Sequence, residues 1–351
     1  MVRVATWTTG ASSLSRADSG AELLLDLATR DPWLALPAAT DADASREVGE
    51  STVAWARHLG LITTEPAAQR LRRAGFERMA ARAFGHEQVS PTRVGLLSRW
   101  LAWLFYLDDQ CDEAPPNARP DRVDDVYGGL LAALQRGQPG LYAGPIETAL
   151  SELWNVTAAD TSAAWRERFI EHFLAQWQGV RAEDENRAAG RIPTLEEYPA
   201  LRRDSNGTFL LLDLIEPFLE VELLPQLAGT PVWVRLNQVA NDVIVWCNDL
   251  ASLPRELAHD DVHNYVIVAA EALGLDAVAA RSWVADRIVD ATVDMRTIAR
   301  SLPGLFARLD LSVAAAAQAN DVVEVIRRAP ANHLAWLLES HRYQDAEKNT
   351  F

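Results

Sequence analysis

The first residues that could do chemistry form an acidic cluster directly after a long apolar segment. The stretch WLFYLDDQCDE ends in Asp108, Asp109, Asp112 and Glu113. On a helix, Asp108 and Asp112 lie four residues apart and Asp109 lies three before Asp112, so three carboxylates share one edge. Carboxylates this close repel one another unless hard cations lie between them, and Mg²⁺ suits such a site. The cluster therefore predicts a magnesium site, although a solvated acidic helix end would explain it equally well when it is taken alone.

A second group of oxygen-bearing side chains follows another apolar segment. In WCNDLASLPRE, the residues Asn248, Ser252 and Glu256 recur every four positions, which places an amide, a hydroxyl and a carboxylate on one helical stripe. All three are ligands for a hard cation. Taken alone the pattern arises easily by chance, but it lies 140 residues after Asp108 in the same kind of setting. Pro254 lacks an N–H, so we expect the helix to deform between Ser252 and Glu256.

The elements that carry these groups are expected to be buried helices. Apolar residues recur at spacings of three and four along the chain, whereas strand-like alternation is scarce. The pattern predicts an all-α protein with about a dozen helices in one domain. Three segments are apolar on nearly every side: 94–107, 209–224 and 232–247. Breaks are expected at the Pro pair 115–116, at 137–140, at 192–193 and at Pro217. A mobile arm is expected over 1–18, a single domain over 19–345 and a tail over 346–351.

Composition excludes several classes of function. The chain has 351 residues, of which 49% are hydrophobic, so it can bury a sizeable core. A formal charge of −16 argues against a broad surface for nucleic acid or anionic lipid. Because the only lysine is Lys348, an anion must be held by metals or local arginines. Two cysteines, Cys111 and Cys247, exclude a disulfide framework. Without a secretory signal or an apolar run of membrane length, a cytoplasmic protein is expected, as monomer or homodimer.

The two clusters together resemble the motifs of a known family. DDQCDE and NDLASLPRE are similar to the aspartate-rich motif and the N-D-x-x-S-x-x-x-E motif of class I terpene synthases, particularly the bacterial sesquiterpene cyclases. Two more segments fit the same family. YPALRRDSNG, from Tyr198 to Gly207, resembles its helix-break segment with a diphosphate-sensing arginine, and HRYQ resembles its terminal Arg-Tyr pair. The resemblance spans residues 100–343.

The resemblance implies a single-domain α-helical bundle with a central apolar cavity. Two facing helices at the mouth would hold a prenyl diphosphate through three Mg²⁺ ions. By position, the metal ligands would be Asp108, Asp109, Asp112, Glu113, Asn248, Ser252 and Glu256. The diphosphate would be contacted by Arg202, with Arg203 as the fallback, and by Arg255, Arg342 and Tyr343. Ser205 would be the linker residue of the helix break. Asn206 would be the effector, the residue whose main-chain carbonyl faces the substrate, a position where glycine is common in the family.

Ionisation of an allylic diphosphate creates a carbocation, which needs a dry apolar cavity because water would quench it. Counted back from Asp108 at 100° per residue, the side chains of Leu101, Leu104 and Phe105 fall within about 60° of its face and should line that cavity. Phe209 and Trp336 are further candidates, since aromatic faces stabilise positive charge. The sequence contains no D-x-D-D motif of the kind used for protonation-initiated cyclisation, which argues for chemistry that starts by ionisation only.

The sequence thus indicates a Mg²⁺-dependent cyclase of farnesyl diphosphate, with geranyl and geranylgeranyl diphosphate as alternatives. A chain-elongating prenyl diphosphate synthase would carry a second D-D-x-x-D motif, where this chain has N-D-x-x-S-x-x-x-E. A non-catalytic helical binding protein would show no Mg²⁺-dependent binding of diphosphate. A further alternative is a synthase that has lost its activity, because Pro254 interrupts the second metal motif and Asn206 replaces the common glycine of the effector position.

Overall fold

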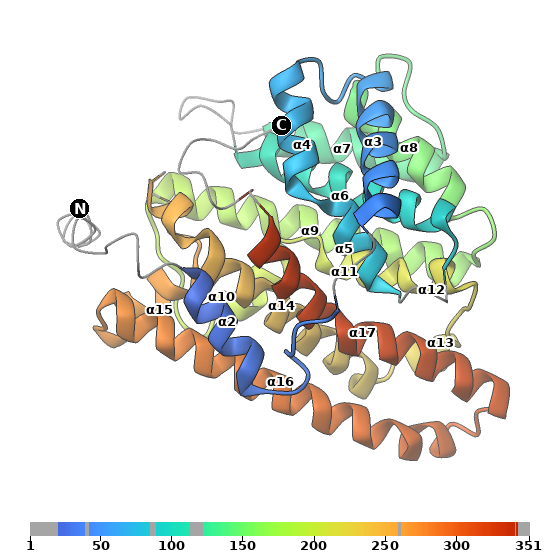
Figure 1. Ribbon diagram of the computed structural model, residues 1–351. Helices are drawn as coiled ribbons and strands as arrows, with labels where there is room; N and C mark the ends of the chain where they lie inside the picture. Colours follow the sequence, from blue (N-terminus) through green and yellow to red (C-terminus); the bar gives the residue numbers. More distant parts are fainter. Residues whose placement is uncertain are drawn as a thin grey trace.

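The computed structural model describes residues 20–38, 42–84, 89–112, 122–258, 261–340 and 342. These residues form sixteen helices, α2 to α17, and no strand (Figure 1). The prediction of an all-α protein is confirmed, although the helices outnumber the expected dozen. The arm over 1–18, the tail over 346–351 and the break at 115–116 lie outside the described residues. In the described ranges no helix is both long and apolar enough to cross a membrane.

The helices follow one another with short connections. Their bounds are α2 Gly20–Arg30, α3 Ala42–His58, α4 Glu65–Ala74, α5 Phe76–Ala83, α6 Pro91–Asp112, α7 Arg122–Arg136, α8 Pro145–Thr157, α9 Ala163–Ala189, α10 Tyr198–Asp204, α11 Thr208–Asp213, α12 Ile215–Leu219, α13 Pro225–Ala228, α14 Pro231–Ala258, α15 Tyr265–Leu273, α16 Ala277–Arg308 and α17 Val313–Glu339.

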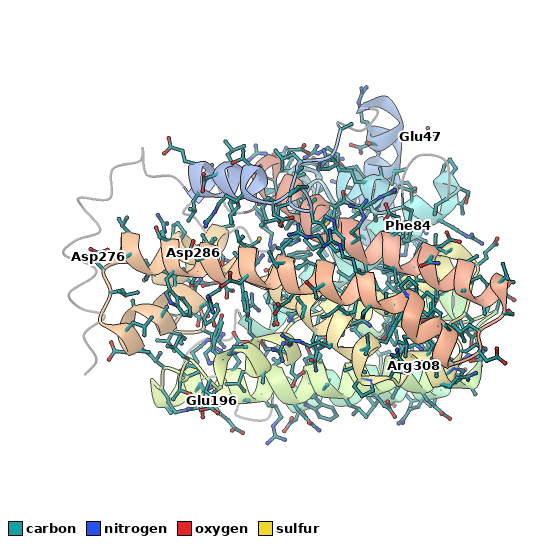
Figure 2. All side chains as sticks on the ribbon, turned by 90° about the horizontal axis from the view of Figure 1, so that it is seen from below. Glu47, Phe84, Glu196, Asp276, Asp286 and Arg308 are labelled. Atoms are coloured by element: carbon teal, nitrogen blue, oxygen red, sulfur yellow. The ribbon has the colours of Figure 1, made fainter. Side chains whose placement is uncertain are left out.

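Local sequence sets where the long helices begin. The side chains of Ser162, Asp276 and Ser312 accept hydrogen bonds from the first backbone N–H groups of α9, α16 and α17. Such caps satisfy donors that have no partner inside a helix. Figure 2 shows α16 crossing the molecule beside α17, with Asp276 and Arg308 at its opposite ends.

Helix α14 lies at the centre of the molecule. It packs against α16, α17, α10, α11, α15 and α2 (Figure 1). Every residue from Val239 to Cys247 is buried, which explains why this segment is apolar on nearly every side. Helix α6 is enclosed in the same way by α3, α5 and α8. The two helices that carry the acidic and amide motifs are therefore both internal, as expected.

The apolar segment 209–224 is divided, as the break expected at Pro217 implies, although its apolar pattern alone is that of one helix. Helix α11 ends at Asp213, α12 ends at Leu219, and Glu220 adopts a positive φ of 57°. Pro217 has no N–H to donate to the carbonyl of Asp213. The indole N–H of Trp165 donates to that carbonyl instead, at 2.9 Å. The helix therefore divides where a proline removes a donor and a tryptophan replaces it.

Pro254 has a smaller effect than expected, because α14 runs without interruption from Pro231 to Ala258. The proline cannot donate to the carbonyl of Leu250. Gly20, at the start of α2, lies against that carbonyl, and a Cβ at this position would be only 3.2 Å from the oxygen. Asn248, Ser252 and Glu256 consequently remain on one helix.

Candidate active site

A cavity of about 180 Å³ lies between α5, α6, the α10–α11 connection, α14 and α17. Its walls are mainly apolar, and Asp108, Arg202 and Asn248 are among the polar residues that line it. Three helices from distant parts of the chain thus bring a carboxylate, a guanidinium cation and an amide to one cavity. The apolar lining residues include Met79, Phe84, Leu97, Leu101, Leu104, Phe105, Leu211, Ile244 and Val325.

Three of the five residues predicted for the cavity line it, namely Leu101, Leu104 and Phe105. The other two lie elsewhere. Phe209 stacks on the ring of His172, with centroids 5.1 Å apart. Trp336 is fully buried behind the cavity wall, where its ring packs 5.2 Å from Phe105 and its indole N–H donates to the carbonyl of Ala74 at 2.6 Å. Trp336 therefore supports the wall from behind.

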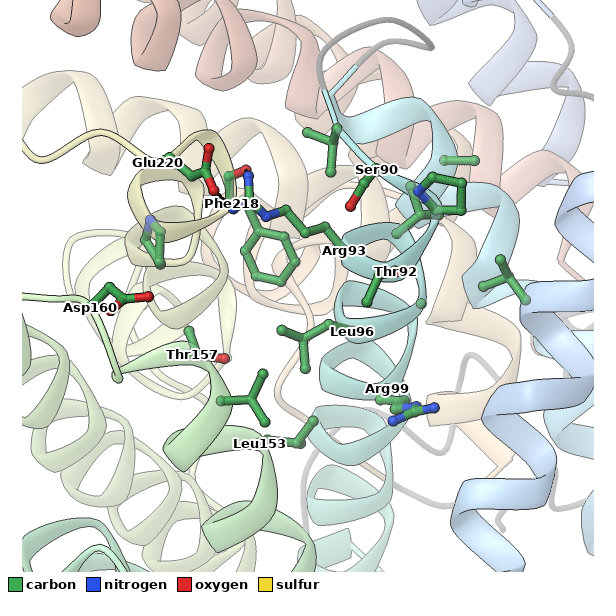
Figure 3. A pocket seen from close by; sticks show the side chains of 18 of the residues that line it. Ser90, Thr92, Arg93, Leu96, Arg99, Leu153, Thr157, Asp160, Phe218 and Glu220 are labelled. Carbon is green, nitrogen blue, oxygen red and sulfur yellow. Dashed lines mark hydrogen bonds and ion pairs between the residues drawn. The ribbon is translucent and has the colours of Figure 1, made fainter.

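A larger hollow of about 1200 Å³ lies at the start of α6, beside α3, α8 and the end of α12. Figure 3 shows Arg93 reaching toward Phe218 and Glu220 across it, and the guanidinium donates to the carbonyl of Phe218 at 3.1 Å. None of the motif residues lines this hollow. Size alone is a poor guide here, since the residues that could do chemistry line the smaller cavity.

The acidic motif on α6 is joined to the C-terminal arginine. Both carboxylate oxygens of Asp109 accept hydrogen bonds from Arg342, at 3.1 and 2.6 Å, and both side chains are buried. Arg255 lies 3.7 Å from the same carboxylate. Asp108 differs, because 55% of its side chain is exposed and its nearest Arg342 nitrogen is 3.6 Å away. Asp108 is thus the carboxylate open to an incoming ion.

Three of the predicted site residues cannot be placed in full. The backbone of Asp112 closes α6, but its side chain lies outside the described part of the structure. Glu113 and Tyr343 lie outside it altogether.

The second motif presents oxygen atoms along α14. The amide oxygen of Asn248 accepts a hydrogen bond from Arg202 at 3.3 Å, and the hydroxyl of Ser252 donates to the carbonyl of Asn248 at 2.8 Å. The carboxyl of Glu256 accepts from the amide of Asn264 at 2.6 Å. Burial first, and then repulsion from Asp249 and Asp261, raise the pKa of Glu256 well above its ordinary value. A cation at this stripe would relieve that repulsion.

The helix break positions Arg202 and Arg203 differently. Arg202 donates to the carboxylate of Asp249 at 2.9 Å and lines the cavity, whereas Arg203 donates to Asp242 at 2.6 Å and is not among the lining residues. Burial opposes a charge on Arg202, but the surrounding acids, Asp249 first, raise the pKa of its guanidinium well above the ordinary value. The geometry therefore favours Arg202 over Arg203 as the arginine that meets a bound anion.

Asn206 builds the turn between α10 and α11. Its amide nitrogen donates to the carbonyl of Arg203 at 2.9 Å and to the side chain of Asn241 at 3.1 Å, and its amide oxygen accepts from the backbone of Thr208 at 2.7 Å. The preceding Ser205 is buried, and its backbone N–H closes α10 on the carbonyl of Leu201 at 2.8 Å. The side chain of Asn206 thus holds the connection between α10 and α11 together.

Asp249 is a site residue that the sequence did not single out, although it lies inside NDLASLPRE. Its carboxylate, fully buried, accepts hydrogen bonds from Arg202 and from the hydroxyl of Tyr198, the latter at 2.7 Å. The side chain of Asn264 donates to its backbone carbonyl at 2.7 Å. The sequence did offer a signal for this residue, because an acidic side chain next to Asn248 on a buried helix requires a partner for its charge.

The donor set fits a hard divalent cation such as Mg²⁺. Asp108 supplies an exposed carboxylate on α6, and α14 supplies an amide, a hydroxyl and a carboxyl oxygen. Within the described ranges no three His, Cys, Asp or Glu side chains gather into a metal-binding group. The proposed magnesium ligands are not of that kind, because two of the three donors on α14 are the side chains of Asn248 and Ser252.

Comparison with known proteins agrees with this geometry. A family model described as terpene synthase family 2, C-terminal metal binding, matches residues 99–294. The chain is 33% identical over 221 residues to (+)-T-muurolol synthase ((2E,6E)-farnesyl diphosphate cyclizing) of Roseiflexus castenholzii, covering 63% of this chain and 67% of that protein. It is 27% identical over 313 residues to pristinol synthase of Streptomyces pristinaespiralis, covering 88% and 83%. The crystal structure of a-eudesmol synthase superposes with a TM-score of 0.77 at 23% identity, covering 87% and 98%.

Proposed function

The chain belongs to terpene synthase family 2, and from that membership we propose that it ionises farnesyl diphosphate and cyclises the resulting carbocation to a sesquiterpene. The observation that carries the proposal is the convergence of Asp108, Arg202 and Asn248 at an apolar cavity. A relative that is 33% identical is named as a synthase that cyclises farnesyl diphosphate. Diphosphate is the other product.

We propose that three Mg²⁺ ions bind with the diphosphate. Asp108 would hold them from α6, with Asp109, Asp112 and Glu113 in supporting roles, and Asn248, Ser252 and Glu256 would hold them from α14. Bound Mg²⁺ stabilises the negative charge that develops on the leaving group. This requirement explains how a chain of charge −16 accepts an anionic substrate.

The arginines around the cavity would orient the diphosphate. Asp249 holds the guanidinium of Arg202 from one side, so the remaining N–H groups can donate to phosphate oxygens. Arg342 and Arg255 lie beside the acidic motif, close to where the metal-bound diphosphate would sit. The backbone carbonyl of Asn206, at the break, is the proposed effector, with Ser205 linking it to Arg202.

The walls of the cavity would protect the carbocation. Leu101, Leu104 and Ile244 present only hydrocarbon, and the ring of Phe105 offers an aromatic face to positive charge. The same walls keep water from the cation until the last step. The hydrocarbon chain of the substrate would therefore lie inside the cavity and the diphosphate at the α6 and α14 motifs.

The first test is incubation of the purified protein with farnesyl diphosphate, with and without Mg²⁺, followed by gas chromatography and mass spectrometry. We expect a Mg²⁺-dependent cyclic product. Parallel incubations with geranyl and geranylgeranyl diphosphate test the chain length. Absence of product from all three substrates would contradict the proposal, and binding of diphosphate would then separate an inactive relative from a binding protein of another kind.

Two substitutions test the metal ligands. Asp108→Ala and Asn248→Ala each remove an oxygen ligand, so we expect turnover to fall by at least about 100-fold, since several kcal/mol of charge stabilisation is lost. The melting temperature should change little. Asp125→Ala removes an exposed carboxylate from α7 and is the matched control. Product yields near wild type from either of the first two variants would contradict the assignment of metal ligands.

A further inference from the structure

His333 is a buried histidine in the wall of the cavity. It lies on α17, is 5% exposed, and lines the cavity together with Val325 and Asn332 of the same helix. Neither of its ring nitrogens has a hydrogen-bond partner within the described part of the chain. Buried polar atoms are nearly always hydrogen-bonded, so two unpartnered nitrogens on one ring call for an explanation.

The ring is held in place by packing rather than by polar contacts. It lies against the indole of Trp336, with centroids 5.3 Å apart. The neighbouring Asn332 donates to the carbonyl of Arg82 at 3.0 Å, which ties this turn of α17 to the end of α5. Packing therefore holds the ring in the cavity wall, while its nitrogens have no hydrogen-bond partner among the described residues.

The imidazole of His333 is neutral under ordinary conditions. Burial first, and the charge of Arg202 second, lower its pKa to about 3. A neutral imidazole carries one N–H and one nitrogen lone pair. Such a ring does not repel a carbocation, and its lone pair can accept a proton.

The other polar groups at the cavity are poorer proton acceptors. Among the described residues that line it, the titratable ones are Asp108, Arg202 and His333. Arg202 has no lone pair to offer. Asp108 belongs to the metal motif at the opening, and the remaining polar lining residues are amides and a hydroxyl. His333 alone in this set combines a basic nitrogen with near-complete burial in the cavity wall.

We propose that His333 accepts the proton that ends the cyclisation. This inference rests on the proposed cyclase function. In the last step a C–H bond next to the cationic carbon breaks, its electron pair forms the C=C bond of the product, and the proton passes to the unpartnered nitrogen of His333. The imidazolium then loses the proton to water when the product leaves. A weak base suffices, because a C–H bond beside a carbocation is far more acidic than an imidazolium.

The test compares wild type with His333→Phe, which keeps an aromatic ring and removes both nitrogens. The substrate is farnesyl diphosphate carrying deuterium at the carbon that loses its proton in the wild-type reaction. We expect diphosphate release within about threefold of wild type and an unchanged carbon skeleton. The share of the wild-type alkene should fall at least about tenfold, since a positioned base contributes about 100-fold or more. The deuterium should be retained in the isomers that replace it.

Val325→Leu is the matched control, because it reshapes the same wall from the same helix and leaves His333 in place. Its products should still lose the deuterium. If His333→Phe does not fold, His333→Asn provides the same test with a side chain of negligible basicity. Loss of deuterium from the same carbon in the folded variant, or a wild-type enzyme whose sole product is an alcohol, would overturn the inference. A wild-type protein without Mg²⁺-dependent product would instead refute the proposed function.

Discussion

The orientation of the Arg202 guanidinium depends on one buried carboxylate, that of Asp249. Asp249 is fully buried and pairs with Arg202 at 2.9 Å. Replacing Asp249 by Asn leaves the guanidinium without its counter-charge, and breaking a buried pair costs about 3–5 kcal/mol. We expect Asp249→Asn to lower the free energy of unfolding by about that amount, and kcat/KM at least about tenfold, since one displaced diphosphate contact is worth more than about 1.4 kcal/mol. Denaturant unfolding and steady-state kinetics measure the two effects.

The neighbouring pair of Arg203 and Asp242 is a control of the same chemistry. It is similarly buried, with a distance of 2.6 Å, but Arg203 does not line the cavity. Asp242→Asn should therefore lose stability and keep most of its kcat/KM. An equal loss of kcat/KM in both variants would contradict a specific role for Asp249.

At the scale of single residues, sequence predicts positions that helical geometry determines. Leu101, Leu104 and Phe105 line the cavity because they share a face with Asp108. Aromatic type alone does not indicate direction, so the same expectation fails for Phe209 and Trp336. Asp249 and His333 escaped notice for another reason: their importance comes from residues that are distant in the chain.

At the scale of elements, the approach of α9 to the helix break depends on a glycine. A Cβ at Gly179 would lie 2.4 Å from the carbonyl carbon of Asp204 and 2.5 Å from the nitrogen of Ser205. Both contacts are with backbone, so α9 and α10 would have to separate. Gly179→Ala should displace Arg202 and Asn206, reduce turnover at least about tenfold, and cost about 1–3 kcal/mol as overpacking does. Product assays and thermal melting measure these losses.

Gly95 in α6 provides the matched control for this substitution. A Cβ there would meet nothing within 4 Å. Gly95→Ala should keep activity and gain up to about 1 kcal/mol, because alanine favours a helix more than glycine does. Wild-type activity in Gly179→Ala would mean that the close approach of α9 does not position the break.

The positions of helices were predictable from the sequence where tertiary contacts do not override the local pattern of apolar residues. Apolar periodicity identified the cores of α6 and α14 correctly. Over 209–224 periodicity alone does not show the division, but Pro217 predicts it, and the helix divides just before that proline. The sequence does not show that Trp165, from another helix, donates to the carbonyl that Pro217 leaves without a donor. The missing N–H of Pro254 predicted a larger deformation than occurs, since α14 continues to Ala258 between packed neighbours. Tertiary contacts decide whether a proline ends a helix, and a single sequence does not contain them.

At the scale of the whole molecule, the buried His333 should shape the response to acid. Its pKa is lowered to about 3 by burial and by Arg202, whereas an unfolded histidine titrates near 6.5. Below pH 6.5 the unfolded chain therefore binds a proton that the folded chain does not. The contribution of His333 to the free energy of unfolding is therefore complete above pH 6.5 and is lost as the pH falls toward 3. At pH 5 the loss amounts to about 2 kcal/mol.

His333→Phe removes this contribution. Between pH 7 and pH 5 the wild type should therefore lose about 2 kcal/mol more of its free energy of unfolding than His333→Phe does. Urea unfolding of both proteins at the two pH values gives the difference directly. A difference that stays constant would show that His333 titrates alike in the folded and unfolded chains.

Net charge links metal and anion binding across the whole molecule. With 33 basic and 49 acidic residues, the chain repels an anion unless cations neutralise the carboxylates of α6 and α14. Inorganic diphosphate alone should therefore leave the melting temperature unchanged, whereas diphosphate with Mg²⁺ should raise it. A ligand present at 100 times its Kd adds about 2.7 kcal/mol, which for a chain of this length raises the melting temperature by about 4 °C. Asn248→Ala should lose this rise and Asp125→Ala should keep it. An equal rise in the presence of a chelator would mean that Arg202, Arg255 and Arg342 bind the diphosphate without metal.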